Sequence, residues 1–141
     1  MLLDLIKFKT KQMKKITIIL FLIISTFGFG QCVDGNCENG VGTYLWEDGS
    51  ISNGSWKNGE LNGIVQEIMY DEEGYLIGSF DGQMTMGVIN GWGIETLYNK
   101  GTLLGTYVGN WRNDDYNGWG IWIEPDGYTE KGIYRNGELI D

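Results

Sequence analysis

The chain has 141 residues, enough for one domain of ordinary size. It contains 23 glycines, 6 tryptophans and 8 tyrosines but no histidine, and its formal net charge is −9. The lack of histidine excludes Ser-His-Asp and Cys-His catalysis, and the negative charge opposes binding to nucleic acid phosphates. Abundant glycine and aromatic residues together favour short strands with frequent turns, because rings supply the packing and glycine supplies the turn conformations.

The first thirty residues have the pattern of a secretory signal peptide. Five lysines precede an apolar run over 16–24, and the segment ends in Gly-Phe-Gly at 28–30. A basic start, a short apolar middle and a small-x-small end predict a signal-peptide helix over 1–30, cleaved before Gln31. Met13 is an alternative start with the same pattern. Retention of this segment as a membrane anchor is the other possibility, although the run is shorter than the roughly 20 residues that span a bilayer.

Removal of residues 1–30 would make the chain still more acidic. The remainder has 5 basic and 18 acidic residues, and hence a formal charge of −13. We therefore expect no binding to nucleic acid and no direct binding to anionic lipid, and we interpret the acidity as typical of a soluble exported protein. The expected location is the periplasm, the cell envelope or the medium.

The only two cysteines, Cys32 and Cys37, follow the predicted cleavage site in the sequence CVDGNC. The intervening Asp-Gly favours a turn that brings the two sulfurs together, and an oxidising compartment would convert the pair to a disulfide. We predict a disulfide-closed loop over residues 31–39. No metal site or other cofactor is predicted, because the chain has neither a second cysteine pair nor a histidine to complete a tetrahedral centre.

From residue 40 onward the chain repeats itself. Residues 47–63 align without gaps with residues 125–141, sharing Asp-Gly, a glycine five positions later, and Asn-Gly-Glu-Leu. Two looser copies lie between them, so that the glycine of a Gly-x-aromatic motif is assigned to Gly54, Gly78, Gly109 and Gly132, at spacings of 24, 31 and 23. This pattern predicts a domain over 40–141 with about four repeats, the second degenerate and the third expanded.

Each copy is predicted to form a β-hairpin. In the first, residues 43–46 form a strand of β-favouring residues, Asp48-Gly49 is a turn signal of the kind that two-residue hairpins prefer, and residues 50–56 return. Asn58-Gly59 then turns into the next copy. Because glycine in a strand lets a neighbouring ring lie across the backbone, the aromatic residues are predicted to stack from hairpin to hairpin.

The repeated residues resemble the MORN repeat, whose pattern reads approximately Gly-x-Gly, Asp-Gly, Tyr-x-Gly-x-Trp and a closing Gly. Residues 107–111, Tyr-Val-Gly-Asn-Trp, match the central motif fully, whereas the other copies depart from it at the Tyr or Trp position. The resemblance implies an all-β fold, an elongated and twisted antiparallel sheet of stacked hairpins, and a role as a scaffold for protein contacts. The expected repeat-core residues are Gly42, Gly54, Trp56, Gly78, Phe80, Gly93, Tyr107, Gly109, Trp111, Gly120, Gly132 and Tyr134.

We predict a non-enzymatic exported scaffold of bacterial type whose sheet binds an unidentified protein. Some large rings of a single-layer sheet must face outward, and large apolar patches often mark contact surfaces. The alternative, that these rings cover the sheet's own concave face, stays open. A glycan is the second candidate ligand, because aromatic platforms suit sugars. The candidate partner surface consists of Trp92, Trp111, Trp119 and Trp122.

The enzymatic alternative is a glycosidase, which needs two carboxylates roughly 5–10 Å apart. Glu67, Glu95 and Glu124 lie at related places in their repeats, which would align them in a row across the sheet. The competing interpretation of these residues is a solvated sheet face. The acidic clusters at 71–73 and 114–115 are interpreted as solvated turns, because neither has the spacing of a calcium-binding loop.

Overall fold

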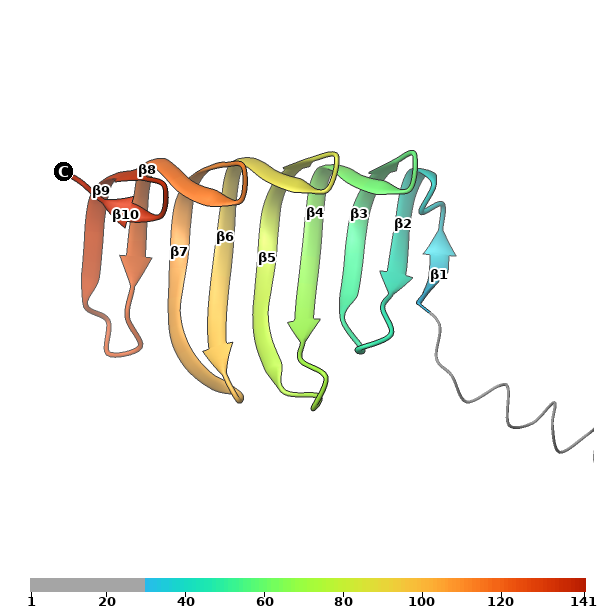
Figure 1. The fold of residues 1–141 in the computed structure, drawn as a ribbon, viewed down its shortest axis with the longest axis horizontal. Coiled ribbons are helices and arrows are strands. Elements are labelled where there is room, and N and C mark those ends of the chain that lie inside the picture. Colours follow the sequence, from blue (N-terminus) through green and yellow to red (C-terminus); the bar gives the residue numbers. More distant parts are fainter. Residues whose placement is uncertain (1–29) are drawn as a thin grey trace, which may run out of the picture.

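The computed structural model describes residues 30–141, which form one antiparallel sheet of ten strands with the strand order of the sequence (Figure 1). The strands lie side by side along the long axis of the molecule (Figure 1). The prediction of an all-β open sheet of consecutive hairpins is confirmed, whereas the predicted signal-peptide helix lies outside the described residues. The strands are β1 (Gln31–Gly35), β2 (Asn39–Leu45), β3 (Ile51–Lys57), β4 (Glu60–Tyr70), β5 (Leu76–Thr85), β6 (Val88–Asn99), β7 (Thr102–Arg112), β8 (Asp115–Ile123), β9 (Thr129–Arg135) and β10 (Glu138–Leu139).

Four two-residue turns, which we call the link turns, join successive hairpins along the upper edge of the sheet in Figure 1. They lie at residues 58–59, 86–87, 113–114 and 136–137, and both residues of each have positive φ, as in type I′ turns. The backbone N–H of the second residue also donates to a carbonyl of the preceding hairpin, at 2.9 Å from Gly59 to Glu38 and 2.8 Å from Gly87 to Leu61. These bonds tie each hairpin to its neighbour.

Three of the four loops at the opposite edge are longer. In the first, the Trp46 N–H donates to the Ser50 carbonyl at 2.8 Å, and Gly49 has a φ of 88°. The Asp48 carboxylate accepts the Ser50 N–H at 2.8 Å. The prediction of a two-residue turn at Asp48-Gly49 is therefore wrong. Three residues lie between the hydrogen-bonded Trp46 and Ser50, and the Asp48 carboxylate caps this longer loop. The loops at 71–75 and 124–128 have the same pattern of backbone bonds.

A row of cross-strand partners, which we call the glycine row, runs through the sheet from β2 to β9. Across each of the three link turns within it, successive members are 11 residues apart, whereas across the hairpin loops the separation varies between 12 and 17. The separation along the chain is therefore constant at the link-turn edge and variable at the hairpin-loop edge. The members are Gly42, Gly54, Val65, Gly82, Gly93, Gly109, Gly120 and Gly132.

The row corrects the predicted alignment of the second repeat. Gly82 pairs with Val65 and Gly93, whereas Gly78 pairs with Met69 and Leu97, outside the row. The motif of this repeat is thus Phe-Asp-Gly-Gln-Met at 80–84, with Phe in the Tyr position and Met in the Trp position. The four motif glycines are then 28, 27 and 23 residues apart, so the single expanded interval is also incorrect.

Rings lie over the glycine row and form the core on one face, which we call the aromatic face. A methyl group at Gly120 would lie 2.5 Å from the Tyr107 Cζ, and Tyr107 is completely buried. The Trp56 Nε1–H donates to the Gly42 carbonyl at 3.0 Å. Close ring contact therefore requires glycine at Gly82 and Gly93, beneath Phe80, and at Gly109 and Gly120, beneath Tyr107. The buried hydrophobic residues are Trp56, Leu61, Val65, Phe80, Met84, Tyr107, Trp111 and Tyr134.

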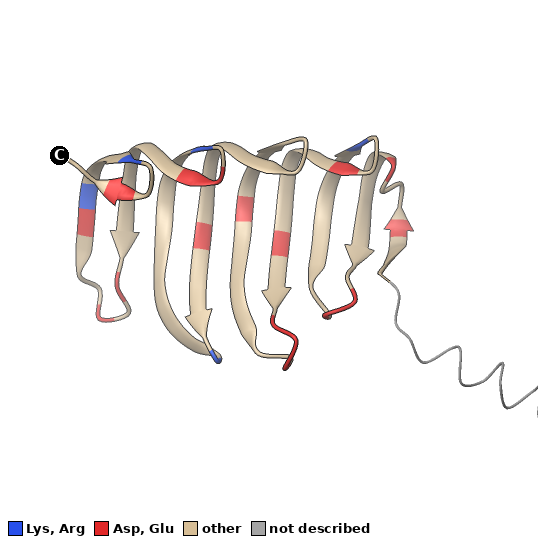
Figure 2. Ribbon diagram, in the orientation of Figure 1, with Lys and Arg blue, Asp and Glu red and all other residues tan. Residues whose placement is uncertain are grey.

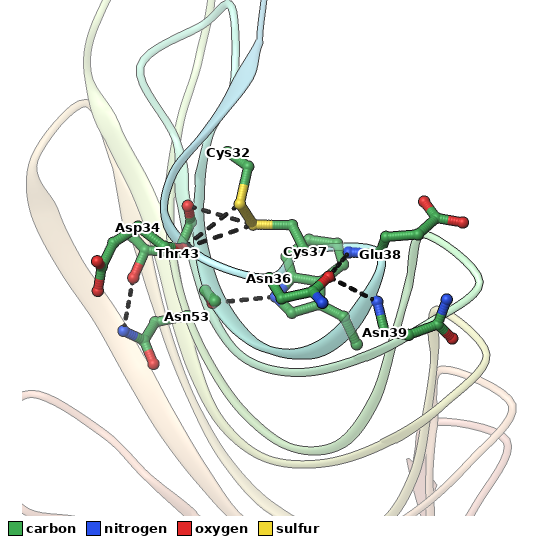
Figure 3. The surroundings of a disulfide bond; sticks show 10 residues. Cys32, Asp34, Asn36, Cys37, Glu38, Asn39, Thr43 and Asn53 are labelled. Carbon is green, nitrogen blue, oxygen red and sulfur yellow. Dashed lines mark hydrogen bonds between the residues drawn. A yellow bond between two sulfur atoms is a disulfide. The ribbon is translucent and has the colours of Figure 1, made fainter.

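The predicted disulfide between Cys32 and Cys37 is present at the first edge of the sheet (Figure 3). Between the two cysteines, the Asn36 side-chain oxygen accepts the backbone N–H groups of Glu38 and Asn39, at 3.0 and 2.9 Å (Figure 3). The segment predicted as a loop differs in one respect, because its first five residues form β1 and pair with β2. The disulfide thus fastens an edge strand to the repeats.

Candidate binding surface

The second face of the sheet, which we call the open face, is built from three rows of cross-strand partners. Side chains alternate between the faces of a strand, so the strand register assigns each residue to a row. The bulge row contains Val41, Ser55, Ile64, Gln83, Trp92, Asn110, Trp119 and Ile133. The middle row contains Thr43, Asn53, Gln66, Asp81, Ile94, Val108, Ile121 and Lys131. The distal row contains Leu45, Ile51, Ile68, Ser79, Thr96, Thr106, Ile123 and Thr129.

The open face carries little charge. Asp81 and Lys131 are the only charged residues in its three rows, and the Asp81 carboxylate accepts a hydrogen bond from the Gln66 amide at 2.9 Å. Figure 2 shows most of the acidic residues at the link turns and hairpin loops, with single ones inside β1, β4, β5, β6 and β9. The protein therefore combines a strongly acidic chain with a nearly neutral sheet face.

Bulges expose the apolar side chains of the bulge row. Strand pairing shifts beside Gly63, Gly91 and Gly118, whose φ values are 124°, 119° and 108°. Positive φ is open to glycine at little steric cost, and a bulge re-aims the neighbouring side chains. The residue after each of these glycines is a large apolar one on the open face. With Val41 from the first repeat, the exposed fractions are 68% for Val41, 60% for Ile64, 49% for Trp92 and 51% for Trp119.

The structure divides the four tryptophans of the predicted partner surface between the two faces. Trp92 and Trp119 lie exposed in the bulge row. Trp111 is 5% exposed on the aromatic face, and its Nε1–H points to the Gly93 carbonyl at 3.4 Å. Trp122 is half-buried on that same face and donates to the Glu124 carboxylate at 2.9 Å. Trp111 is thus a core residue and belongs to no exposed partner surface.

Two exposed members of the open face, Val41 and Ile64, were missed by the prediction. Both follow Asn-Gly, as Trp92 and Trp119 do. The recurring Asn-Gly-apolar triplet was the signal that could have identified all four. At Ile64, Trp92 and Trp119 it accompanies a bulge, whereas β2 pairs with β3 at Val41 without one.

The predicted carboxylate row is present only in part. Glu67 and Glu95 are the cross-strand neighbours of Phe80 on its two sides, which places them two strands and about 10 Å apart. Phe80 between them is 2% exposed. Trp122 occupies the corresponding position in β8, so Glu124 lies outside the row at the hairpin loop.

Each of the two aligned carboxylates is held by a hydroxyl of its own. Ser52 donates to Glu67 at 2.6 Å, and the Tyr116 hydroxyl donates to Glu95 at 2.6 Å. Burial raises the pKa of Glu95, and the hydrogen bond from Tyr116 opposes that shift. Burial also raises the pKa of Tyr107, which stacks on Tyr116 at 3.7 Å, to about 12. These groups form hydrogen-bonded pairs within the aromatic face.

Within residues 30–141, no group of three or more His, Cys, Asp or Glu side chains is arranged to hold a metal ion. The same part of the chain contains no helix of sufficient length and apolarity to cross a membrane. Comparison of the chain with protein-family models gives no match, and comparison with curated proteins gives none either.

Proposed function

We propose that the chain is an exported, non-enzymatic scaffold of MORN-type repeats that mediates protein–protein contacts. The observation that carries the proposal is the nearly neutral open face, and in particular its half on β2–β5, where Asp81 is the one charged residue of the three rows. Ile77 lies two residues before Ser79 on β5 and therefore on the same face. The side chains of Val41, Ile51, Ile64, Ile68 and Ile77 are between 37% and 68% exposed. We call these five residues the aliphatic patch.

The aliphatic patch has the composition expected of a protein interface. Interface cores are depleted in charged residues and rich in large apolar ones. Within the patch, Val41 and Ile64 lie in the bulge row and Ile51 and Ile68 in the distal row, with the polar middle row between them. The patch lies on a chain that has 18 acidic residues beyond residue 30. Its lack of charge therefore favours a partner that presents apolar side chains rather than a basic surface.

The roles of the repeat residues support the MORN interpretation. In the motif at residues 107–111, the tyrosine ring covers paired glycines and the tryptophan reaches back to the glycine row of the preceding strand. Trp56 makes the corresponding bond to Gly42. A Tyr-x-Gly-x-Trp pattern is thus the set of residues that this hairpin packing needs.

Two features support export. The basic and apolar pattern of residues 1–30 predicts a signal peptide, and the disulfide is of a kind that persists in oxidising compartments. Mass measurement of the protein from its native cells should give an N-terminus at Gln31. A chain that retains residues 1–30 would contradict cleavage and favour the anchored alternative.

The scaffold function is tested by site-specific cross-linking in the native cells, followed by reconstitution with the purified partner. A photo-reactive residue at Ile64 should trap a protein that also binds the purified chain. The double variant Val41→Lys and Ile64→Lys should weaken that affinity at least about tenfold, because it places two charges in an apolar contact. Leu139→Lys is the matched control, since Leu139 is 40% exposed and pairs with Tyr134 of the aromatic face. Equal affinity in both variants would refute the proposal.

A further inference from the structure

We propose that the other half of the open face, on β6–β8, is a binding site for a neutral, extended, β-linked polysaccharide, with Trp92 and Trp119 as its two stacking platforms. This inference goes beyond the scaffold function and uses different residues from the aliphatic patch. A chain with both surfaces would attach a protein partner to a glycan.

The spacing of the two rings carries the proposal. Trp92 and Trp119 occupy equivalent positions on β6 and β8, each directly after a bulge glycine. With β7 between them, two strand spacings separate the side chains by about 10 Å. This is close to the length of one disaccharide unit in an extended β-linked glycan, in which alternate sugar rings present the same face. The two tryptophans can therefore stack on alternate sugars of one chain.

Sheet twist suits the same ligand. Neighbouring strands rotate by roughly 20–25° relative to one another, so two platforms separated by two strands are turned by roughly twice that angle. Extended β-linked glycans are themselves gently twisted ribbons. A glycan chain running across the strands, along the bulge row, could follow both rings.

Amide side chains stand beside the rings. Trp92 is paired with Asn110, and the Asn110 amide donates to the Trp119 carbonyl at 3.0 Å. On the other side, the Gln83 side-chain oxygen accepts the Trp92 N–H at 2.9 Å. These bonds use one end of each amide, and both residues are exposed, so that the Gln83 nitrogen and the Asn110 oxygen are available to a ligand. Alternating rings and amides match a sugar, which offers C–H groups on its faces and hydroxyls at its edges.

Charge selects a neutral polysaccharide over an acidic one. The bulge row has no charged residue, and the middle row contributes one acid and one base. Acidic residues outnumber basic ones at the hairpin loops, where Lys100 is the single basic residue, so this edge of the sheet would repel a polyanion (Figure 2). The neutral row in this acidic setting therefore favours an uncharged chain.

The proposal is tested with the chain beginning at Gln31 and with two neutral probes, cellohexaose and chitohexaose, using tryptophan fluorescence and calorimetry. At least one hexasaccharide should bind, and its disaccharide should bind at least about tenfold more weakly, because only the longer chain reaches both rings. Trp92→Ala and Trp119→Ala should each lower the affinity about tenfold, as expected for loss of an aromatic contact. The conservative changes to Phe should lower it less.

Tyr128→Ala is the matched control, since Tyr128 is a 61% exposed ring in a hairpin loop outside the open face. It should leave binding unchanged, and thermal unfolding should show that all variants are folded. No binding of either hexasaccharide, equal binding of the disaccharide, or unchanged binding in both alanine variants would each overturn the proposal. Tighter binding of the polyanion polygalacturonate would overturn it as well. If the tryptophans prove to be needed only for the cross-linked protein partner, the site belongs to the scaffold function instead.

Discussion

Replacement of Gly82 and Gly78 by alanine compares two glycines in one strand that differ only in what lies above them. A methyl group at Gly82 would lie 2.6 Å from the Gly93 Cα and 2.7 Å from the Phe80 Cζ. The backbone atom cannot move without disturbing the sheet, and Phe80 is buried. At Gly78 the nearest atom is the terminal methyl of Met69, at 3.0 Å, which a flexible side chain can withdraw. The nearest backbone atom there, the Thr96 carbonyl oxygen, lies at 3.3 Å, well beyond the 2.6 Å contact at Gly82.

Overpacking of a closed site costs about 1–3 kcal/mol of unfolding free energy. For a domain of this size, Gly82→Ala should therefore lower the melting temperature by about 4–12 °C. Gly78→Ala should lower the unfolding free energy by less than Gly82→Ala does, because its closest contact is with a flexible side chain. Urea titration followed by tryptophan fluorescence, with thermal unfolding by circular dichroism, measures both. A larger loss at Gly78 than at Gly82 would refute the register described here and restore the alignment expected from the sequence.

Three further changes test other contacts. Glu95→Gln should reduce the pH dependence of stability. Because burial raises the pKa of Glu95, the folded state holds a proton in the acidic range that the unfolded state releases. The unfolding free energy of the parent therefore falls as the pH rises through this range. The urea concentration at the unfolding midpoint should fall with rising pH in the parent and change less in the variant. An equal change in both proteins would contradict the raised pKa of Glu95. Trp56→Phe should cost about 1–3 kcal/mol in urea titration, through its lost hydrogen bond and ring volume, whereas the exposed Trp119→Phe should cost little. Replacement of both cysteines by serine should lower the unfolding free energy by at most about 2 kcal/mol. It should also raise amide hydrogen exchange in β1, while β4–β7 keep their protection. Loss of protection throughout the sheet would show that the disulfide stabilises more than the edge strand.

The link turns show which turn conformations can be predicted from the local sequence. Asn58-Gly59 and Asn136-Gly137 were predictable, because Asn and Gly accept the positive φ values that these turns need. Met86 adopts a φ of 49° in the equivalent turn without such a preference. There the flanking repeats impose the conformation, through ladder bonds and the bond from Gly87 to the Leu61 carbonyl. A turn set by its neighbours cannot be found from its own residues.

The displaced alignment of the second repeat has a similar origin. Gly78-Ser79-Phe80 imitates the Gly-x-aromatic motif, because Phe80 fills the position that Tyr107 fills in the third repeat. Met84 replaces the tryptophan that would have marked the true register. Only the cross-strand pairing of Gly82 with Gly93 resolves the ambiguity.

The division of the tryptophans between faces also required the register. Alternation along β8 assigns Trp119 and Trp122 to opposite faces, but composition does not say which face is covered. The pairing of Trp122 with Tyr107 places Trp122 on the aromatic face and leaves Trp119 on the open one. The existence of exposed rings on one face was therefore predictable, whereas the identity of the exposed residues depended on long-range contacts.

The difference between the two edges of the sheet has a consequence for how such a molecule can be altered. Eleven residues separate members of the glycine row across every link turn within it, while the hairpin loops tolerate separations from 12 to 17. Residues can thus be added at the loop edge, lengthening two strands, without changing the interval between Ile64, Trp92 and Trp119. Insertion of a whole hairpin at a link turn would instead extend the bulge row by about 10 Å and one further exposed residue. Reach and ligand preference could then be engineered independently, by the number of hairpins and by the residue placed after each Asn-Gly.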